Sequence, residues 1–478
     1  MKTFLKLIFL APVTLLPVFA QAQTYSDIYG FSLYSGYPPS NYDGAIPECA
    51  LVVSNNVLYG TTWEGGTNGV GGIFSVATDG SQFHELYSFS ALSGEIYGNN
   101  SDGAEPYCTL LLSSNMLYGT ANAGGLNGGG TIFRINTDGT GFSNIYNFGT
   151  YSGAPHAGLI ISGNVLFGTS TSGGQGYGSV FRLNADGTHF TNLISFYPAA
   201  TNFAFSATGE LILSGSTLYG TTQGGGSGFQ GTIFSLGTNN HGGYTNLFFF
   251  EGVGGQSQAS TNTTGGNPTH GLVLAGNRLY GTTPAGGTNG NGVIYGINMD
   301  GSGFTNMHTF SATTNSTNYD GITPDCQLLA VGNTLYGTAS AGGPAGFGSI
   351  YSINADGTGF TVLWGFPDIP NADYLDQDGI GAAGGLVESG STLYGTSSGG
   401  GGYDGNVYGL DLSSIVPPPT LGFQINQGSL TLTWDPSKFT LQVTAYLGGE
   451  GFSDVVGATS PYVIIPTQSS AFYRLRSN

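Results

Sequence analysis

The sequence has 478 residues, of which 85 are glycine, 13% are aromatic and only 7% are charged. Acidic residues outnumber Lys and Arg by 27 to 8, which gives a formal net charge of −19. This balance argues against nucleic acid and anionic membranes as partners, because phosphate groups are bound by clustered Lys and Arg.

The N-terminal segment is typical of a secretory signal peptide. Lys2 and Lys6 are followed by an apolar run over residues 7–19, and Ala20-Gln21-Ala22 forms an A-x-A cleavage site. We therefore expect residues 1–22 to be removed and the mature chain to be secreted or held at the cell surface. No later stretch approaches the ~20 apolar residues of a spanning helix, so no membrane span is predicted.

A repeated unit fills most of the remaining chain. It is marked seven times by the motif LYGT or its near copy LFGT, whose aromatic residues are Tyr59, Tyr118, Phe167, Tyr219, Tyr280, Tyr336 and Tyr394. Self-similarity with a period of this size is typical of a propeller, a solenoid or an array.

The copy at residues 271–310 shows the content of one unit. Its four strand-like runs, which we name A to D, are 271–275, 278–283, 293–297 and 304–310. Gly276-Asn277 and Asp300-Gly301 are hairpin signals, and no run has helical periodicity. Four antiparallel strands per repeat form the blade of a β-propeller, so an all-β fold is predicted.

The order of the strands indicates a closed ring. The segment YSDIYGF at residues 25–31 has the pattern of strand D, as in FSNIYNF at 142–148, but it precedes the first A strand. The seventh unit supplies strands A, B and C and no D. We therefore predict a seven-bladed β-propeller over residues 23–415, closed by its N-terminal strand.

Asp-Gly dipeptides occur in two sets. Those between strands C and D are interpreted as hairpin turns, in which the glycine supplies a positive φ: Asp79, Asp138, Asp186, Asp300 and Asp356. The other set lies between strand D of one blade and strand A of the next: Asp43, Asp102, Asp320 and Asp378.

The second set suggests a binding surface. The D–A and B–C loops of a propeller leave the same face. Glu48 and Asp325 add acids to the same connections, and His156 and His270 stand near the starts of blades 3 and 5. We predict an electronegative face that binds a sugar, a basic partner or Ca²⁺, which prefers several oxygen ligands such as Asp43, Asp102, Asp320 and Asp378. The alternative is that duplicated Asp-Gly turns were kept in some copies and lost in others.

Two further residue types are candidates for special roles. Trp63 follows strand B of the first blade and could stack on a sugar. Cys49, Cys108 and Cys326 occupy equivalent places in blades 1, 2 and 6. We interpret them as small apolar core residues, although Cys49 and Cys108 on neighbouring blades could also form a disulfide.

The sequence changes character after the seventh unit. A Pro-rich linker spans residues 416–420, and strand-like runs without the glycine repeat fill residues 421–478. This last segment is predicted to be a small β-sandwich-like domain, near the lower size limit for an independent core.

The seven copies of the unit, such as LYGTTPAGGTNGNGVIYGINMDGSGFTNMHTF, resemble the Gloeobacter/Verrucomicrobia-type tandem repeat (GloVer repeat) of exported bacterial proteins with varying C-terminal anchors. The resemblance covers residues 24–415 and implies an extracytoplasmic propeller-like protein. The family has no established activity, so it implies no catalytic residue. The segments GATSPY and FYRLR resemble small β domains that end such proteins.

Three functions follow as alternatives. The first is a binding scaffold, a monomer whose acidic loop face takes an extracellular glycan or protein, since loops on a rigid scaffold commonly carry function. The second is a carbohydrate-active enzyme, a glycosidase or lyase, that uses carboxylates on that face. The third is a structural surface or matrix protein. No cofactor is expected apart from the calcium ion considered above.

Overall fold

The computed structural model describes residues 23–413, except 34–39, 94–97, 151–152, 174–175, 198–203, 240–242, 253–260, 368–379 and 400–403, and the strands that follow residue 421. The predicted signal peptide, the Pro-rich linker and Asp378 lie outside the described residues. The described part of the chain is built from strands and contains no helix, and hence no helix able to cross a membrane.

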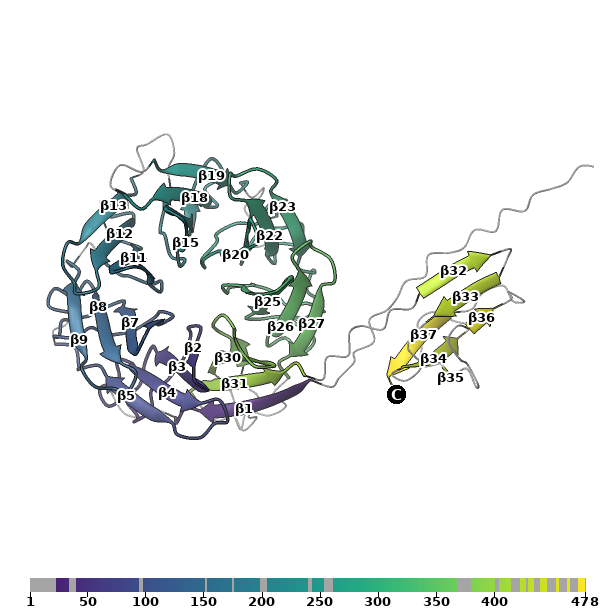
Figure 1. Ribbon diagram of the computed structural model, residues 1–478, viewed down its shortest axis with the longest axis horizontal. Helices are drawn as coiled ribbons and strands as arrows, with labels where there is room; N and C mark the ends of the chain where they lie inside the picture. Colours follow the sequence, from purple (N-terminus) through teal and green to yellow (C-terminus); the bar gives the residue numbers. More distant parts are fainter. Residues whose placement is uncertain are drawn as a thin grey trace, which may run out of the picture. The chain divides into compact units, whose positions relative to one another are not determined.

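Residues Thr24–Asp411 form one compact unit of seven antiparallel blades arranged in a ring (Figure 1). Blade 1 contains β2 (Val52–Ser54), β3 (Val57–Thr62), β4 (Gly72–Ala77) and β5 (His84–Ser88). Blade 2 contains β6 (Leu111–Ser113), β7 (Met116–Ala121), β8 (Thr131–Asn136) and β9 (Ser143–Asn147). Blade 3 contains β10 (Ile160–Ser162), β11 (Val165–Ser170), β12 (Ser179–Asn184) and β13 (Thr191–Ser195). Blade 4 contains β15 (Ile212–Ser214), β16 (Thr217–Thr222), β18 (Thr232–Gly237) and β19 (Thr245–Phe249). Blade 5 contains β20 (Val273–Ala275), β21 (Arg278–Thr283), β22 (Val293–Asn298) and β23 (Thr305–Thr309). Blade 6 contains β24 (Leu329–Val331), β25 (Thr334–Ala339), β26 (Ser349–Asn354) and β27 (Thr361–Gly365).

Blade 7 is assembled from both ends of this unit. It contains β29 (Val387–Ser389), β30 (Thr392–Gly399), β31 (Asn406–Asp411) and the N-terminal strand β1 (Thr24–Gly30). The short strand β28 (Ile380–Ala382) also pairs with β30, and β14 (Ala204–Phe205) pairs with β17 (Gly224–Gly225) in the loops of blade 4. The predicted seven-bladed propeller, closed by its N-terminal strand, is therefore confirmed.

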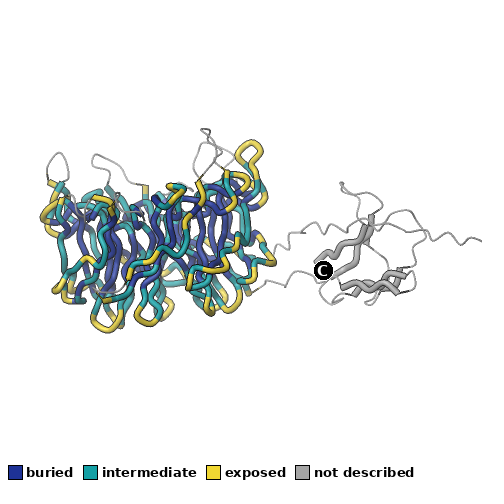
Figure 2. The backbone as a smooth tube through the Cα atoms, turned by 90° about the horizontal axis from the view of Figure 1, so that it is seen from above, coloured by how far each residue is buried: buried dark blue, intermediate teal, exposed yellow. Residues whose placement is uncertain are grey.

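The short A strands lie nearest the centre of the ring and the D strands form its outer wall (Figure 1). Strands B and C are almost entirely buried, as the dark core of each blade in Figure 2 shows. Their side chains pack between neighbouring blades; Tyr59, for example, belongs to the same apolar cluster as Leu117 and Phe133 of the next blade. The core is thus a set of contacts between blades, each of which needs its neighbours.

The outer strands share one irregularity that fixes their register. Every D strand has a β-bulge opposite strand C, where one residue is skipped, as Ile28 is in β1 and Ile145 in β9. A bulge bends the strand and increases its twist. The seven D strands can therefore curve around the same ring.

The D–A and B–C loops lie at the same end of the blades, which we call the loop face. Backbone bridges join them in four blades, for example Ala45 to Glu64 and Ala104 to Ala123. An Asn side chain adds a second tie: Asn100 Nδ2 donates to the carbonyls of Ser90 and Gly103, and its Oδ1 accepts from the amides of Gly103 and Gly125. Equivalent bonds are made by Asn41, Asn262 and Asn318.

The strands beyond the propeller form a second unit. They make two three-stranded sheets, β32 (Gly422–Asn426) with β33 (Ser429–Thr433) and β36 (Tyr462–Ile464), and β34 (Phe439–Thr444) with β35 (Ser453–Asp454) and β37 (Phe472–Ser477).

Candidate functional site in the axial cavity

The aspartates of the D–A loops are structural in the three blades where they are described. Asp43 Oδ2 accepts hydrogen bonds from Tyr29 Oη (2.9 Å), the Ser32 amide (2.9 Å) and Ser32 Oγ (2.7 Å). Asp102 is bound in the same way by Tyr87 and Ser90. Asp320 is bound by His308 and Ser311. All three side chains are buried, at 5%, 5% and 1% exposure.

These carboxylates do not converge. Each binds the outermost strand of the preceding blade, so they lie at three separate blade interfaces away from the centre of the ring. Among the described residues no group of three or more His, Cys, Asp or Glu side chains could hold a metal ion. The expectation of a joint site for Asp43, Asp102 and Asp320 is therefore not supported by their positions, because hydrogen bonds to the preceding strand hold each carboxylate at its own blade interface.

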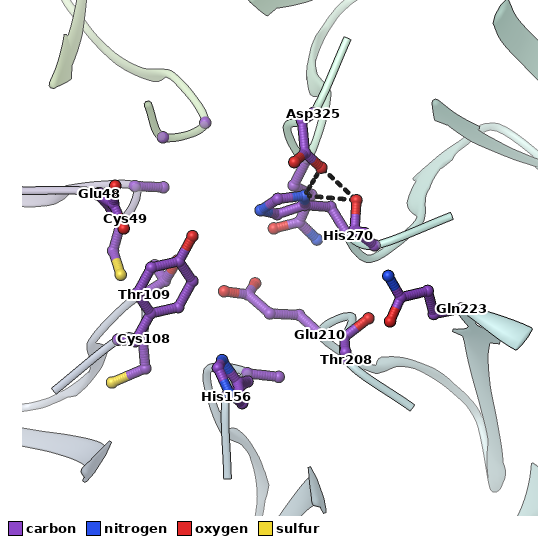
Figure 3. Close-up of a pocket in the computed structure, with 17 residues that line it drawn as sticks. Glu48, Cys49, Cys108, Thr109, His156, Thr208, Glu210, Gln223, His270 and Asp325 are labelled. Atoms are coloured by element: carbon purple, nitrogen blue, oxygen red, sulfur yellow. Dashed lines mark hydrogen bonds and ion pairs between the residues drawn. The ribbon is translucent and has the colours of Figure 1, made fainter. Parts of the chain in front are cut away.

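A cavity of about 200 Å³ lies on the axis of the ring instead. All seven blades contribute to its wall, through residues at the start of each A strand. Only the axis can be touched by all seven blades at once, and Figure 3 shows the side chains of Glu48, His156, Glu210 and His270 approaching a common space from different blades.

The wall is built from one repeated segment. It has a Pro, three variable positions and a Leu: 47–51, 106–110, 155–159, 268–272 and 324–328, with Ala in place of Pro at 207–211 and 382–386. The Leu is buried in every blade. The variable positions face the cavity, where their chemistry differs between blades: Glu48, Tyr107, His156, Thr208, Glu210, Thr269, His270, Asp325, Gly384 and Gly385.

Glycine allows the inner segments of neighbouring blades to come close together around the cavity. An added Cβ at Gly384 would lie 2.5 Å from the backbone of Cys49, and one at Gly271 would lie 2.5 Å from the carbonyl oxygen of Glu210. No side chain fits at such distances. Blade 7 therefore contributes only backbone atoms at 384–385.

His270 and Asp325, from adjacent blades, form a hydrogen-bonded pair. His270 Nδ1 lies 2.8 Å from Asp325 Oδ1, and the hydroxyl of Thr269 donates to the same oxygen. Their side chains are still 28% and 36% exposed, which shows that they face the cavity. Burial alone would lower the pKa of His270, but the hydrogen bond with Asp325 and the charges of Asp325 and Glu210 raise it. Burial opposes the shift of Asp325, yet His270 holds the pKa of Asp325 below its usual range.

Glu210 enters the cavity from blade 4. Its surroundings of protein atoms raise the pKa of the carboxyl, while hydrogen bonds with Thr109 and the Gly158 backbone and the charge of His270 oppose that rise. The carboxyl lies against Gly158, where an added Cβ would be 2.7 Å from Oε1. Its position is thus fixed by contacts from blades 2 and 3.

Glu48, Tyr107 and His156 complete the polar wall. Burial raises the pKa of Glu48, although Tyr107 hydrogen-bonds to it. Burial and the nearby charge of Glu48 also raise the pKa of Tyr107. His156 packs against the Tyr107 ring with centroids 5.4 Å apart, and burial lowers its pKa, so its neutral form is favoured.

The three cysteines are free and buried. Cys108 Sγ and Cys326 Sγ each bond to the backbone of strand B in their own blade, at Thr120 and Thr338. Burial raises the pKa of Cys108 to about 11, which disfavours the reactive thiolate. The interpretation of the cysteines as core residues agrees with these positions, and Cys49 and Cys108 are not joined.

The loop face also carries the exposed apolar side chains. Among the described residues, all eight large hydrophobic side chains that are exposed lie in D–A or B–C loops or at the loop-face end of a D strand: Leu33, Tyr42, Leu126, Tyr177, Tyr197, Phe229, Phe249 and Tyr319. Tyr42 is the most exposed, at 79%. Trp63, the predicted sugar-stacking residue, lies at the same end but is half-buried and outside the cavity wall.

Four of the sequence-predicted site residues thus meet at the cavity: Glu48, His156, His270 and Asp325. Glu210, Tyr107 and the paired Thr269 were missed. The register of the repeated segment could have found Tyr107 and Thr269, because it places them at the same position as Glu48, His156 and Asp325. Glu210 stands two places further along, at the position of Thr109 and Gln327, so the register alone does not single it out. The acidic residues of the D–A loops had instead predicted a site at Asp43, Asp102 and Asp320.

The sequence of the ring was compared with known protein families. The model of the Gloeobacter/Verrucomicrobia repeat matches residues 95–263 and 257–417, which is more than half of the chain. The chain belongs to this family. The predicted resemblance is confirmed, and a propeller built from Gloeobacter/Verrucomicrobia repeats suits a binding scaffold. No match was found among curated protein sequences.

Solved structures with similar folds are distant in sequence. An oligogalacturonate lyase from Vibrio parahaemolyticus is 8% identical with a TM-score of 0.50, over 83% of this chain and 95% of the lyase. A puromycin-hydrolysing peptidase of Mycobacterium tuberculosis is 10% identical with a TM-score of 0.48, over 85% of this chain and 62% of the peptidase. At 8% identity the similarity to the lyase shows a shared fold alone.

Proposed function

We propose that this protein is an exported carbohydrate-binding protein whose ligand carries no net negative charge and binds at the loop face. One observation supports the proposal more than any other. The axial cavity opens among inner-strand residues at the same end of the ring where all eight exposed large hydrophobic side chains of the described chain lie. Exposed apolar groups that gather on one face commonly mark an interaction site.

The chemistry of both features suits a sugar. Tyr and Phe rings present flat apolar surfaces that can stack on the C–H face of a pyranose, while Tyr keeps a polar end in water. The cavity offers carboxylates, imidazoles and hydroxyls that can donate to and accept from sugar hydroxyls. Its volume of about 200 Å³ is below the range of roughly 300–1,000 Å³ for drug-sized ligands, so we expect it to take one end residue of a longer chain.

Charge selects among carbohydrates. Glu48, Glu210 and Asp325 line the cavity, and its described wall contains no Lys or Arg. The whole chain carries −19, so an anionic sugar would be repelled both at a distance and on contact. Export is proposed on the predicted signal peptide.

The test is calorimetric titration of the full mature chain with three kinds of oligosaccharide: neutral glucose oligomers, cationic glucosamine oligomers and anionic galacturonate oligomers. We expect binding of neutral or cationic oligomers and none of the anionic ones. Tyr42→Ala and Phe229→Ala should each weaken binding about tenfold, the ~1–3 kcal/mol scale of a lost aromatic contact. Asp79→Asn and Asp186→Asn, in C–D turns at the opposite end, are matched controls that should bind normally. Selective binding of galacturonate, or no binding to any oligomer, would contradict the proposal.

A further inference from the structure

The axial cavity contains two proton-handling groups that a binding function does not require. His270 stands in blade 5 and Glu210 in blade 4, and Figure 3 shows both side chains entering the same space. The two segments lie side by side, since an added Cβ at Gly209 would be 2.6 Å from the backbone of His270, and the charge of each group affects the pKa of the other.

Asp325 determines which nitrogen of His270 faces the cavity. A carboxylate can only accept, so Nδ1 carries the proton in its 2.8 Å bond to Asp325 Oδ1. The neutral ring then has its lone pair on Nε2, the atom that remains for a ligand. Thr269 donates to the same Asp325 oxygen and helps to hold the pair. A positioned histidine of this kind is a general base.

Glu210 is held in place but remains available. Thr109 and the Gly158 backbone fix its carboxyl, and its protein surroundings favour the protonated form. A carboxyl in such surroundings can act as a general acid. The other titratable groups that face the pair are Glu48, Cys49, Tyr107, Cys108, His156 and Asp325. Of these, Glu48 is occupied by Tyr107 and Asp325 by His270.

We infer that the axial cavity is a hydrolytic site for a glycosidic bond, with Glu210 as general acid and His270 as general base; this inference rests on the proposed carbohydrate binding. His270 Nε2 takes a proton from water as the water oxygen forms a bond to the anomeric carbon. The bond from that carbon to the leaving oxygen breaks, and Glu210 gives its proton to this oxygen. Water is the co-reactant, and the proton gained by His270 returns to Glu210 to complete the cycle.

The pH dependence follows from the proton count. The pair is active when Glu210 is protonated and His270 is neutral. The pH profile of kcat/KM should therefore be bell-shaped, with two apparent pKa values that belong to the pair. In Glu210→Gln the remaining activity depends on the base alone and should rise with pH to a plateau. In His270→Gln it depends on the acid alone and should fall as pH rises.

The test uses the full mature chain and 4-nitrophenyl glycosides of neutral hexoses and of glucosamine. We expect release of nitrophenol, and a loss of about 10²–10⁴-fold in kcat/KM for His270→Gln. Glu210→Gln should lose as much in hydrolysis of the unactivated oligomers, whose leaving oxygen needs a proton, and much less with the 4-nitrophenyl glycosides. Calorimetric binding of the oligomers should fall much less than kcat/KM in both variants, because the exposed aromatic side chains of the loop face remain. His189→Gln, an exposed histidine outside the cavity, should behave as the wild type.

A second measurement examines the geometry without a substrate. Imidazole NMR, assigned with His270→Gln, should show His270 protonated at Nδ1 when neutral, and Asp325→Asn and Glu210→Gln should each lower the pKa of His270. Oligosaccharide binding without hydrolysis, or a neutral His270 protonated at Nε2, would overturn this inference and leave the proposed binding function intact. Failure of binding itself would overturn both.

Discussion

The aspartate of the Asp-Gly dipeptide has two different roles in this ring. In Asp138-Gly139 the aspartate is exposed and accepts from the amide and hydroxyl of Thr140, as a turn residue does. In Asp102-Gly103 the aspartate is buried and accepts from Tyr87 and Ser90 of the strand before it. The dipeptide alone does not separate the roles. The residues that precede the loop do, because Ser90 supplies both a hydroxyl and an amide.

Asp102→Ala should therefore destabilise the propeller much more than Asp138→Ala. Removing the buried carboxylate leaves the Tyr87 hydroxyl and the Ser90 amide without an acceptor, at a cost of about 2–4 kcal/mol. Urea denaturation followed by tyrosine fluorescence measures the difference. Equal and small changes for both variants would show that Asp102 is a turn residue only. Calcium should not alter the stability of either variant.

The candidate site could be predicted from the sequence only in part, for a reason visible at this scale. His156, His270, Glu48 and Asp325 were found because they are unusual residues near blade starts. Glu210 follows a glycine in a blade that lacks the preceding proline, so the repeat is hardest to align there. Which side chains meet on an axis depends on register to the residue, whereas the presence of a blade depends only on pattern.

At the scale of the strand, stacked rings join the outer wall of the propeller. In six of the seven blades an aromatic ring at the start of the D strand stacks on a ring of the preceding D strand, as Phe83 does on Tyr29 with centroids 3.9 Å apart, and Phe142 on Tyr87 at 3.7 Å. Phe190 on Tyr146, Phe304 on Phe248 and Phe360 on His308 continue the series. At the junction that closes the ring, Tyr25 of β1 stacks on Trp364 at 5.0 Å. In blade 4, Tyr244 packs edge-on against Phe196 instead.

Tyr25→Ala should thus weaken the closure of the ring. The ring of Tyr25 also lies 5.6 Å from that of Tyr408 in β31, so its loss removes packing on both sides. We expect a decrease of about 2–4 kcal/mol in the free energy of unfolding. Tyr42→Ala, the same change at a residue 79% exposed, is the control and should change stability by no more than ~0.5 kcal/mol.

Hydrogen exchange locates the effect. The amides of β31 that pair with β1 should lose protection in Tyr25→Ala before those of the other blades do. If β31 keeps its protection while the whole ring is destabilised evenly, the strand is not the weak point of closure.

For the whole molecule, the fold was more predictable than the site because it repeats. Seven copies of one pattern identified the blades, and a D-type segment in front of the first blade identified the closure. The Asn side chains that tie loop to loop, and the bulge in each D strand, were not predicted, because they depend on hydrogen-bond geometry rather than on the apolar pattern. The second unit offers no repeat, and only its strand content could be read from its sequence.

Closure of the ring depends on the pairing of β1 with β31 and not on the position of β1 in the chain. Moving β1 to another place in the chain tests this. Thr24 lies opposite Asp411, and Ser26 opposite Gly409, as Ser143 lies opposite Arg134 within blade 2. In blade 2 the residues 137–140, Thr-Asp-Gly-Thr, make the turn between these strands. Residues 24–33 moved to follow Asp411 through a Thr-Asp-Gly-Thr turn should therefore form an ordinary C–D hairpin.

The rearranged chain would start at Ser40 and continue after Leu33 with residues 412–478. We expect it to fold to the same ring, with a melting temperature close to that of the native arrangement and with the imidazole signal of His270 unchanged. Deletion of residues 24–33 without reinsertion should leave β31 as an open edge and favour association between copies. Size-exclusion chromatography and thermal denaturation distinguish the two variants. A rearranged chain that behaves like the deletion would mean that the N-terminal position of β1 is itself required, and that the seventh blade is more than a copy of the other six.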